Sequence, residues 1–247
     1  MIDLNHQPKF HEQVSTLLDA ALQAERSQQA HRRYLGASRL GVPCERALQY
    51  EYVDAPVDDG AELPGRTLRI FEVGHVMEDL AIRWLRLAGF DLYTRKQDGE
   101  QFGFSVAGGR IQGHVDGVIA GAPVELGLSF PMLWECKTMN DKNWRDTAKK
   151  GVTVTKPIYA AQVAIYQAYL ELHEQPAIFT AINADTMEIY TELVPFDGAL
   201  AQRMSDRALK VISATDAGEL LPRSFLDPTH FECRMCAWQD RCWRNTP

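Results

Sequence analysis

Two sets of side chains in this sequence have the types and spacing to do chemistry. In the first set, Asp116 lies upstream of Glu135-Cys136-Lys137, so two carboxylates and an ammonium fall in neighbouring segments. Carboxylate oxygens are the ligands that Mg²⁺ and Mn²⁺ prefer, and a nearby lysine can stabilise negative charge that develops at a phosphoryl group. The sequence therefore predicts a metal-dependent hydrolytic site around Asp116 and Glu135.

The second set consists of cysteines. Cys233, Cys236 and Cys242 form a C-x2-C-x5-C array near the end of the chain, and Cys44 lies far upstream. Ligands so far apart in sequence cannot make a local zinc finger, whose ligands are closely spaced. Thiolates bind soft metals, so we expect the fold to bring both ends of the chain to one thiolate site.

A strand over 130–138 would position the first set. Side chains alternate across a sheet, so Glu135 and Lys137 share one face while Trp134 and Cys136 point to the other. Cys136 is therefore expected to be a buried free thiol outside the cysteine array. We expect Asp116 to lie on a second strand, 109–120, on the same face as His114.

The other elements alternate between helices and strands. We expect a loop over 54–64 and an irregular tail after Pro222, and Pro43 suits the first turn of a short helix. The periodicities predict helices at 10–34, 43–52, 66–88, 142–149, 157–173 and 197–217. Strands are expected at 90–94, 101–107, 109–120, 130–138, 177–183 and 186–194. This order predicts an α/β fold with a mixed central sheet flanked by helices.

Length and composition are those of a globular chain. With 247 residues, of which 45% are hydrophobic and 24% charged, one large domain with a sizeable core is expected. No run of apolar residues is long enough for a membrane span, and the N-terminus lacks the pattern of a signal peptide. We therefore predict a cytoplasmic protein, or one of the host cytoplasm if phage-encoded, where thiols stay reduced.

Basic residues gather just downstream of Glu135. The net charge of −7 argues mildly against indiscriminate nucleic-acid binding, but a local groove can differ from the whole chain. A solvated helix face is the plain alternative for such a run, although its position beside the acidic set favours phosphate contact. Trp144 and Tyr169 could stack on bases, but aromatic residues at these spacings are more often core. The predicted DNA contacts are Lys142, Arg145, Lys149 and Lys150.

An ordered series of residues resembles the PD-(D/E)XK nuclease superfamily, in its RecB-like branch: His75, Asp116, Glu135, Lys137, Gln162 and Tyr166. The resemblance implies a restriction-endonuclease-like core that cleaves DNA with Mg²⁺ or Mn²⁺. The implied metal ligands are His75, Asp116, Glu135 and the backbone carbonyl of Cys136. The implied catalytic residues are Asp116, Glu135, Lys137, Gln162 and Tyr166.

The resemblance also bears on residues around these positions. Gly74 is expected to let the helix that bears His75 pack closely against the sheet. His114 competes with His75 for the same ligand role. Gln162 and Tyr166 are one helical turn apart and so share a helix face.

The cysteines resemble those of the iron–sulfur subgroup of RecB-like nucleases, which includes CRISPR-adaptation nucleases and phage exonucleases. The resemblance implies a [4Fe–4S] cluster held by Cys44, Cys233, Cys236 and Cys242, with a structural role. Zn²⁺ at the same thiolates, or with His230 in place of one, is the alternative. The implied organisation is an N-terminal helical extension, 1–34, and a nuclease domain, 35–247. Within that domain, 222–247 and Cys44 form the cluster-binding part.

The resemblance implies a deoxyribonuclease and favours an exonuclease that acts on single strands or duplex ends. Recombination, repair, replication and CRISPR adaptation are the implied settings, with DNA and a helicase, recombination or integration protein as partners and no membrane. The sequence has no G-x-x-x-x-G-K-[ST] motif, so unwinding would need such a partner. A catalytically inactive nucleic-acid-binding protein of the same fold and an iron–sulfur redox or sensor protein remain alternatives.

Overall fold

A five-stranded sheet in the order β2-β5-β6-β7-β8 is the centre of the computed structural model, which describes residues 7–30 and 32–244. Strands β6 and β7 are parallel and the other neighbours are antiparallel, so the predicted mixed sheet is confirmed. The strands are β2 (Asp91–Tyr93), β5 (Gly117–Gly121), β6 (Met132–Met139), β7 (Ala177–Asn183) and β8 (Ile189–Val194).

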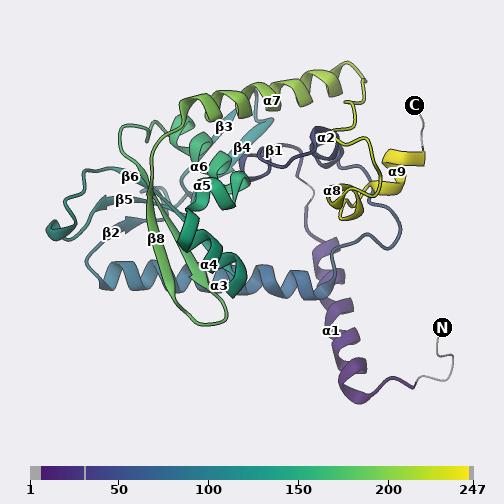
Figure 1. Cartoon of the computed structure of the whole chain (residues 1–247), viewed down its shortest axis with the longest axis horizontal. Helices are drawn as coiled ribbons and strands as arrows, with labels where there is room; N and C mark the ends of the chain where they lie inside the picture. Colours follow the sequence, from purple (N-terminus) through teal and green to yellow (C-terminus); the bar gives the residue numbers. More distant parts are fainter. Residues whose placement is uncertain (1–6, 31, 245–247) are drawn as a thin grey trace.

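The two faces of this sheet are covered by different helices. Leu133 and Phe179 belong to a cluster with residues of α6 (Pro157–Tyr169) and α7 (Gly198–Asp216). Trp134 and Ile178, on the opposite face, pack with Ala81 of α3 (Gly65–Leu87). Figure 1 shows α3 along one side of the sheet and α7 along the other. All residues of β7 are buried, as expected for a strand that is covered on both faces.

A second sheet, in the order β1-β4-β3, was not predicted. It consists of β1 (Leu35–Gly36), β3 (Gly103–Val106) and β4 (Ile111–His114). The single strand predicted over 109–120 is wrong, because the chain leaves the extended pairing at Val115 and Asp116 and continues as β5 in the other sheet. Asp116 therefore lies at a break between sheets, and His114 does not share a strand face with it.

Other helix predictions need smaller corrections. Helix α1 (Phe10–Ser27) ends well before residue 34; it has no buried residue, so no core contact extends it. Helix α2 (Glu45–Tyr52) begins after Cys44, which is its N-cap, so Pro43 lies outside it. Helix α6 ends at Tyr169 and not near 173, because Glu171 takes a positive φ of 57°. The tail predicted to be irregular contains α8 (Phe231–Arg234) and α9 (Gln239–Arg244).

The other predicted elements follow in the predicted order, with short helices between them that were not predicted. Helix α4 (Asp141–Lys150) follows β6 directly, and α5 (Val152–Thr155) leads into α6. Short 3-10 turns lie at η1 (Ala37–Arg39) and η2 (Val124–Leu126), the second between β5 and β6. Helix α3 ends at Leu87, and Gly89, with φ of 91°, follows it in the left-handed region that favours glycine. Among the described residues, no helix combines the length and apolar character needed to cross a membrane.

Gly113 and Gly74 differ in how much space surrounds them. A Cβ at Gly113 of β4 would come within 2.5 Å of the Tyr166 ring and 2.7 Å of Phe104, so close packing of β4 on α6 requires glycine there. A Cβ at Gly74 would meet nothing within 4 Å. The prediction that Gly74 allows close packing of its helix against the sheet is therefore wrong.

Gly113→Ala should destabilise the protein by about 1–3 kcal/mol, because the added methyl overpacks the contact between β4 and Tyr166. Gly74→Ala is the matched control, since open space surrounds it and alanine favours the helix by up to about 1 kcal/mol. Denaturant unfolding of both variants measures this. Equal stability of Gly113→Ala and the parent protein would contradict the packing described.

Candidate active site

Glu135 is the buried centre of the predicted catalytic set. Its side chain is fully buried, and β6 directs it to the same face of the sheet as Lys137. One carboxylate oxygen, Oε1, accepts hydrogen bonds from Lys137 Nζ and from Gln162 Nε2, the latter at 2.5 Å. The other, Oε2, is buried and has no hydrogen-bond partner among residues 7–30 and 32–244. A buried oxygen without a partner is costly, so this atom is a natural place for a cation to bind.

Two further carboxylates lie close to Glu135. Asp116, at the break between the sheets, accepts a hydrogen bond from the backbone N–H of Cys136 at 2.8 Å. Burial and the charge of Asp116 raise the pKa of Glu135 to about 8. Burial and the same charge raise the pKa of Glu78, on α3, to about 7. Negative charge is thus crowded here, and a divalent cation would relieve the crowding.

Lys137 supplies the positive charge. Although burial lowers its pKa, the charges of Glu135 and Asp116 raise that pKa well above its usual range, so the amine is held as an ammonium. The ammonium nitrogen lies 5.5 Å from the centroid of the Tyr159 ring, within cation–π range. That ring stacks on buried Phe179, with 6.3 Å between centroids and planes 28° apart.

Helix α6 brings three side chains to this charge cluster. Gln162 is 5% exposed and donates to both Glu135 Oε1 and, at 3.3 Å, the hydroxyl of Tyr166. Burial and the charge of Glu135 raise the pKa of Tyr166, so its hydroxyl stays protonated. Tyr159, Gln162 and Tyr166 follow at i, i+3 and i+7 and so share a helix face. The sequence analysis missed Tyr159, although its spacing from Gln162 was a usable signal.

The upstream helix contributes a different residue from the one predicted. His75 is exposed and makes no hydrogen bond or ion pair with another described residue, so its role as a metal ligand stays a prediction. Glu78, one helical turn later, is the α3 residue whose charge interacts with Asp116 and Lys137. The sequence analysis missed Glu78, and its i+3 position relative to His75 was the available signal. His114 is exposed at the end of β4.

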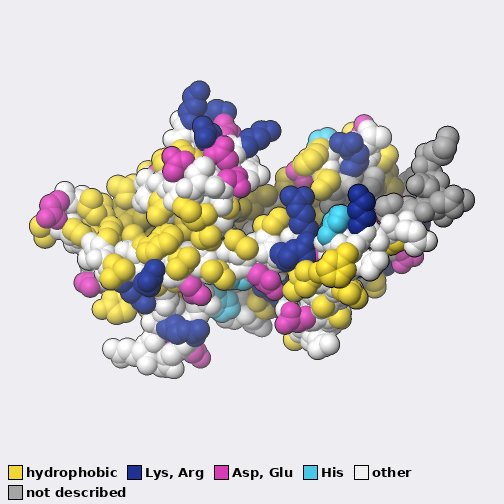
Figure 2. All heavy atoms as spheres, turned by 90° about the horizontal axis from the view of Figure 1, so that it is seen from below, with side chains coloured by type: hydrophobic (Ala, Val, Ile, Leu, Met, Phe, Trp, Pro, Cys, Tyr) yellow, Lys and Arg dark blue, Asp and Glu magenta, His cyan; other side chains and the backbone are white. Residues whose placement is uncertain are grey.

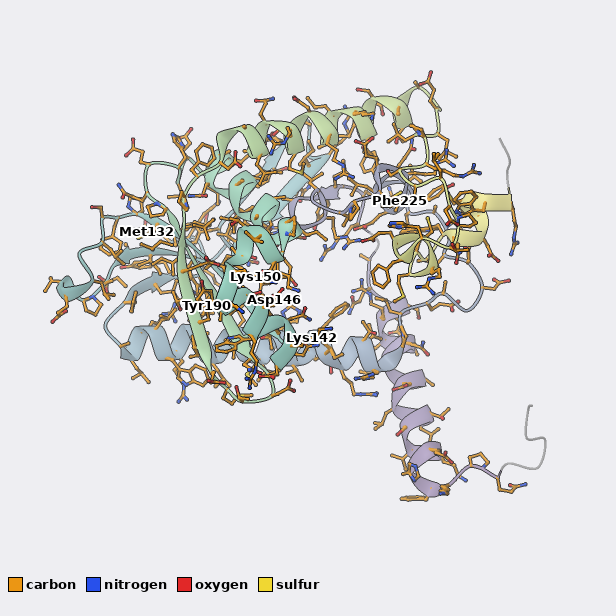
Figure 3. The ribbon with its side chains drawn as sticks, in the orientation of Figure 1. Met132, Lys142, Asp146, Lys150, Tyr190 and Phe225 are labelled. Carbon is orange, nitrogen blue, oxygen red and sulfur yellow. The ribbon has the colours of Figure 1, made fainter. Side chains whose placement is uncertain are left out.

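The predicted basic residues lie along α4. Lys142, Arg145, Lys149 and Lys150 are all exposed. Arg145 pairs with Asp141 at 2.8 Å and Lys150 with Asp146 at 2.6 Å, and such exposed pairs contribute little stability and can exchange for phosphate. Figure 3 shows Lys142, Asp146 and Lys150 on this helix.

Both aromatic residues weighed as possible base contacts are used inside the fold. The Trp144 indole donates to the carbonyl of Ala181 at 2.9 Å. Tyr169 stacks on Phe104 with 4.6 Å between centroids, and its hydroxyl donates to Ser205 at 3.0 Å. Their structural role agrees with the core alternative.

The fold brings the upstream and downstream cysteines to one region. Next to Cys44, the backbone N–H of Glu45 donates to Ser224 Oγ at 3.2 Å. Arg46 donates to the carbonyl of Leu221 at 2.5 Å and contacts Cys242 Sγ at 3.6 Å. The beginning of α2 is therefore docked on the tail that carries the cysteine array.

The thiols in this region influence one another electrostatically. Burial, together with the charges of Cys44, Cys242 and Cys233, raises the pKa of Cys236. All five cysteines are free, and Cys136 is buried in the cluster of Trp134 on the other side of β6. Sulfur donors gathered in one region fit a thiolate-bound metal centre.

As the side chains stand, no group of three or more His, Cys, Asp or Glu in residues 7–30 and 32–244 is arranged to hold a metal ion. The metal assignments at the carboxylates and at the cysteines therefore stay predictions. The donor chemistry at each place nevertheless matches the group predicted for it: oxygen donors for Mg²⁺ or Mn²⁺, and sulfur donors for iron or zinc.

Comparison with known proteins identifies similar folds. No protein-family model and no curated protein matches the sequence. The crystal structure of SSO0001 has a TM-score of 0.53 at 16% identity, over 97% of this chain and 100% of that one. An alkaline exonuclease, LHK-Exo from Laribacter hongkongensis, has a TM-score of 0.53 at 15% identity, over 82% and 93% of the two chains. The structure of LHK-Exo in complex with dAMP has a TM-score of 0.52 at 15% identity, over 82% of this chain and 93% of that one. The chain therefore shares the fold of an alkaline exonuclease.

The metal-free protein should lose stability as pH rises from about 5 to about 8. The carboxyl pKa of Glu135 rises from its usual 4.5 to about 8 on folding, so the folded state binds more protons than the unfolded state across that window. Saturating Mn²⁺ should raise the melting temperature more at about pH 8 than at about pH 6, because cation binding requires the ionised carboxylates. Glu135→Gln should flatten both dependences. A melting temperature that rises steadily with pH in the metal-free protein would contradict this charge arrangement.

Replacing any one of Cys44, Cys233, Cys236 or Cys242 by Ala should remove bound metal from anaerobically purified protein and lower its melting temperature. Cys136→Ala is the matched control and should retain the metal, because its thiol lies in a separate cluster. Iron, sulfide and zinc analysis of each variant measures this. Metal loss in the Cys136 variant would overturn the predicted ligand set.

Proposed function

We propose that this protein is a deoxyribonuclease that hydrolyses phosphodiester bonds with Mg²⁺ or Mn²⁺. The observation that carries the proposal is the fully buried Glu135, whose unpartnered Oε2 lies in a cluster with Asp116, Glu78 and Lys137. Two acidic oxygen donors beside a lysine are the parts that metal-assisted phosphodiester hydrolysis requires. The shared fold of an alkaline exonuclease, also solved with dAMP, supports DNA as the substrate class.

The residues that would hold the cation are Asp116, Glu135 and the backbone carbonyl of Cys136, with His75 or Glu78 from α3 as a further ligand. When bound, the cation would polarise the phosphoryl oxygen and lower the pKa of its water. The chain's own groups then divide the remaining work. Lys137, held as an ammonium, stabilises negative charge at the phosphoryl group.

Helix α6 keeps these groups in position. The side-chain amide of Gln162 donates to Glu135 Oε1 and so holds that carboxylate. The same amide nitrogen donates to the hydroxyl of Tyr166, which fixes the orientation of the amide. Tyr159 holds the ammonium of Lys137 over its ring face. Such positioning matters because small displacements of reacting groups cost large factors in rate.

At finer detail, we propose a RecB-like nuclease of the PD-(D/E)XK superfamily, acting as an exonuclease on single strands or duplex ends. In this proposal Cys44, Cys233, Cys236 and Cys242 hold a [4Fe–4S] cluster with a structural role, and Zn²⁺ is the alternative. Hydrolysis needs no redox step, which favours the structural role. Such an enzyme fits a role in recombination, repair, replication or CRISPR adaptation. It would act there with a helicase or integration partner.

Asp116→Asn and Glu135→Gln should abolish Mn²⁺-dependent cleavage of end-labelled single- and double-stranded DNA and weaken Mn²⁺ binding in titration calorimetry. Lys137→Ala should lower the cleavage rate about 10²- to 10³-fold and retain Mn²⁺ binding, because its role is to stabilise charge. Cys136→Ala, on the opposite face of β6, is the control and should cleave normally. Cleavage by Glu135→Gln at the parent rate under saturating Mn²⁺ would refute the proposed site.

A further inference from the structure

Two aromatic rings stack at the surface between α7 and α8. The ring centroids of Phe225 and His230 are 4.0 Å apart and their planes differ by 14°. His230 is exposed, Phe225 is half-buried, and the neighbouring Leu226 is 94% exposed. The ring of His230 is also fixed from its edge, because Nδ1 accepts a hydrogen bond from the backbone N–H of Glu232 at 3.2 Å. The stacking and this hydrogen bond hold the exposed ring of His230 against Phe225.

The aromatic pair and the basic residues of α4 lie on separate parts of the molecule. Figure 3 shows Phe225 on one side and Lys142 and Lys150 on the other. Figure 2 shows a notch between two raised parts of the surface, each carrying Lys or Arg side chains, with histidine on one of them. On α4, Lys142, Arg145 and Lys149 recur at i, i+3 and i+7, so they line one helix face.

Helix α4 also connects this notch to the candidate active site. It begins at Asp141, directly after β6, the strand that carries Glu135 and Lys137. A chain of phosphates along the basic face of α4 would therefore reach the end of the catalytic strand. Exposed lysines along a groove are the usual electrostatic guide for a nucleic-acid backbone.

The combination of a basic face and a stacked aromatic pair favours one ligand class. In a single strand the bases are free, and each base that stacks on an aromatic ring contributes about 1–3 kcal/mol. In a duplex the bases are already stacked and paired, so an aromatic platform beside the backbone would gain little. A single-stranded nucleic acid uses both features at once.

We propose that Phe225 and His230 form a base-stacking platform, which with the basic face of α4 binds single-stranded nucleic acid across the notch. This inference rests on the proposed nuclease function and names the substrate form. The platform is held in place by the docking of the tail on α2, since Ser224, adjacent to Phe225, accepts from the backbone N–H of Glu45. The cysteine-bearing segment thereby contributes to substrate binding as well as to the fold.

The test measures binding without cleavage. Fluorescence anisotropy of an end-labelled oligodeoxythymidine is followed in EDTA, with Phe225→Leu, which keeps an apolar side chain, and His230→Asn, which keeps an N-cap acceptor. Each variant should bind about 5- to 150-fold more weakly, the range that corresponds to the loss of one base stack. Phe225→Tyr, which keeps the ring, and Leu226→Ala, an exposed neighbour, should bind like the parent protein.

A second probe isolates the stacking. On an oligonucleotide of the same length built from abasic sites, the penalty of Phe225→Leu should vanish, whereas Lys142→Ala should still weaken binding. The platform would be overturned if Phe225→Leu and His230→Asn both bound the thymidine strand as tightly as the parent protein. It would also be overturned if Phe225→Leu weakened binding of the abasic strand as much as binding of the thymidine strand. Tighter binding of a blunt duplex than of the single strand would overturn it as well. Melting temperatures in the same buffer verify that each variant is folded.

The same set of measurements separates the two proposals. If the parent protein binds the single strand in EDTA and the ring-removing variants weaken it, yet no Mn²⁺-dependent cleavage occurs, the platform stands and the nuclease assignment falls. If DNA is cleaved with Mn²⁺ and the ring-removing variants bind as the parent does, the nuclease assignment stands and the platform falls.

Discussion

The burial of one carboxylate, that of Glu135, is the constraint on which the rest of the site depends. A charge with no solvent exposure is costly to bury unless other groups compensate it. Here Lys137 and Gln162 hold one oxygen and leave the other without a partner. The compensation is therefore incomplete, and the raised carboxyl pKa values of Glu135 and Glu78 express the same deficit. The cation that we propose would compensate this deficit.

The second sheet has its clearest role as a support for this site. Gly113 of β4 allows the ring of Tyr166 to approach, and Phe104 of β3 meets the same ring edge-on at 6.1 Å. Tyr166 in turn accepts from the amide of Gln162, which holds Glu135. The close packing of β4 on α6 therefore positions Tyr166, which positions Gln162, which in turn holds the buried carboxylate of Glu135. Rigid packing of this kind fixes geometry better than an isolated hydrogen bond does.

Sequence patterns predicted the parts of this arrangement that depend on local periodicity. Strand alternation correctly separated Glu135 and Lys137 from Trp134 and Cys136, and helical spacing put Gln162 and Tyr166 on one face. The break at Asp116 was missed, because 109–120 alternates like one strand and only pairing with two different sheets divides it. Strand β1 has two residues, too few for any period. Glu78 and Tyr159 share helix faces with His75 and Gln162, so their spacing was a usable signal, but only the packing of α3 and α6 beside β6 brings them to the site.

Hydrogen bonds join the tail to the loop before α3. Asp58, in the loop before α3, accepts from the backbone N–H of Asp240 at 2.6 Å and of Arg241 at 3.1 Å, and so caps α9. In the same loop, the carbonyl of Ala55 accepts from the Trp238 indole at 2.9 Å. These bonds fix the tail residues between Cys236 and Cys242 independently of any metal. A thiolate-bound metal would thus add to an interface that is already formed. These hydrogen bonds already close the long loop between Cys44 and the tail, so they offset much of the entropic cost of loop closure before a metal binds.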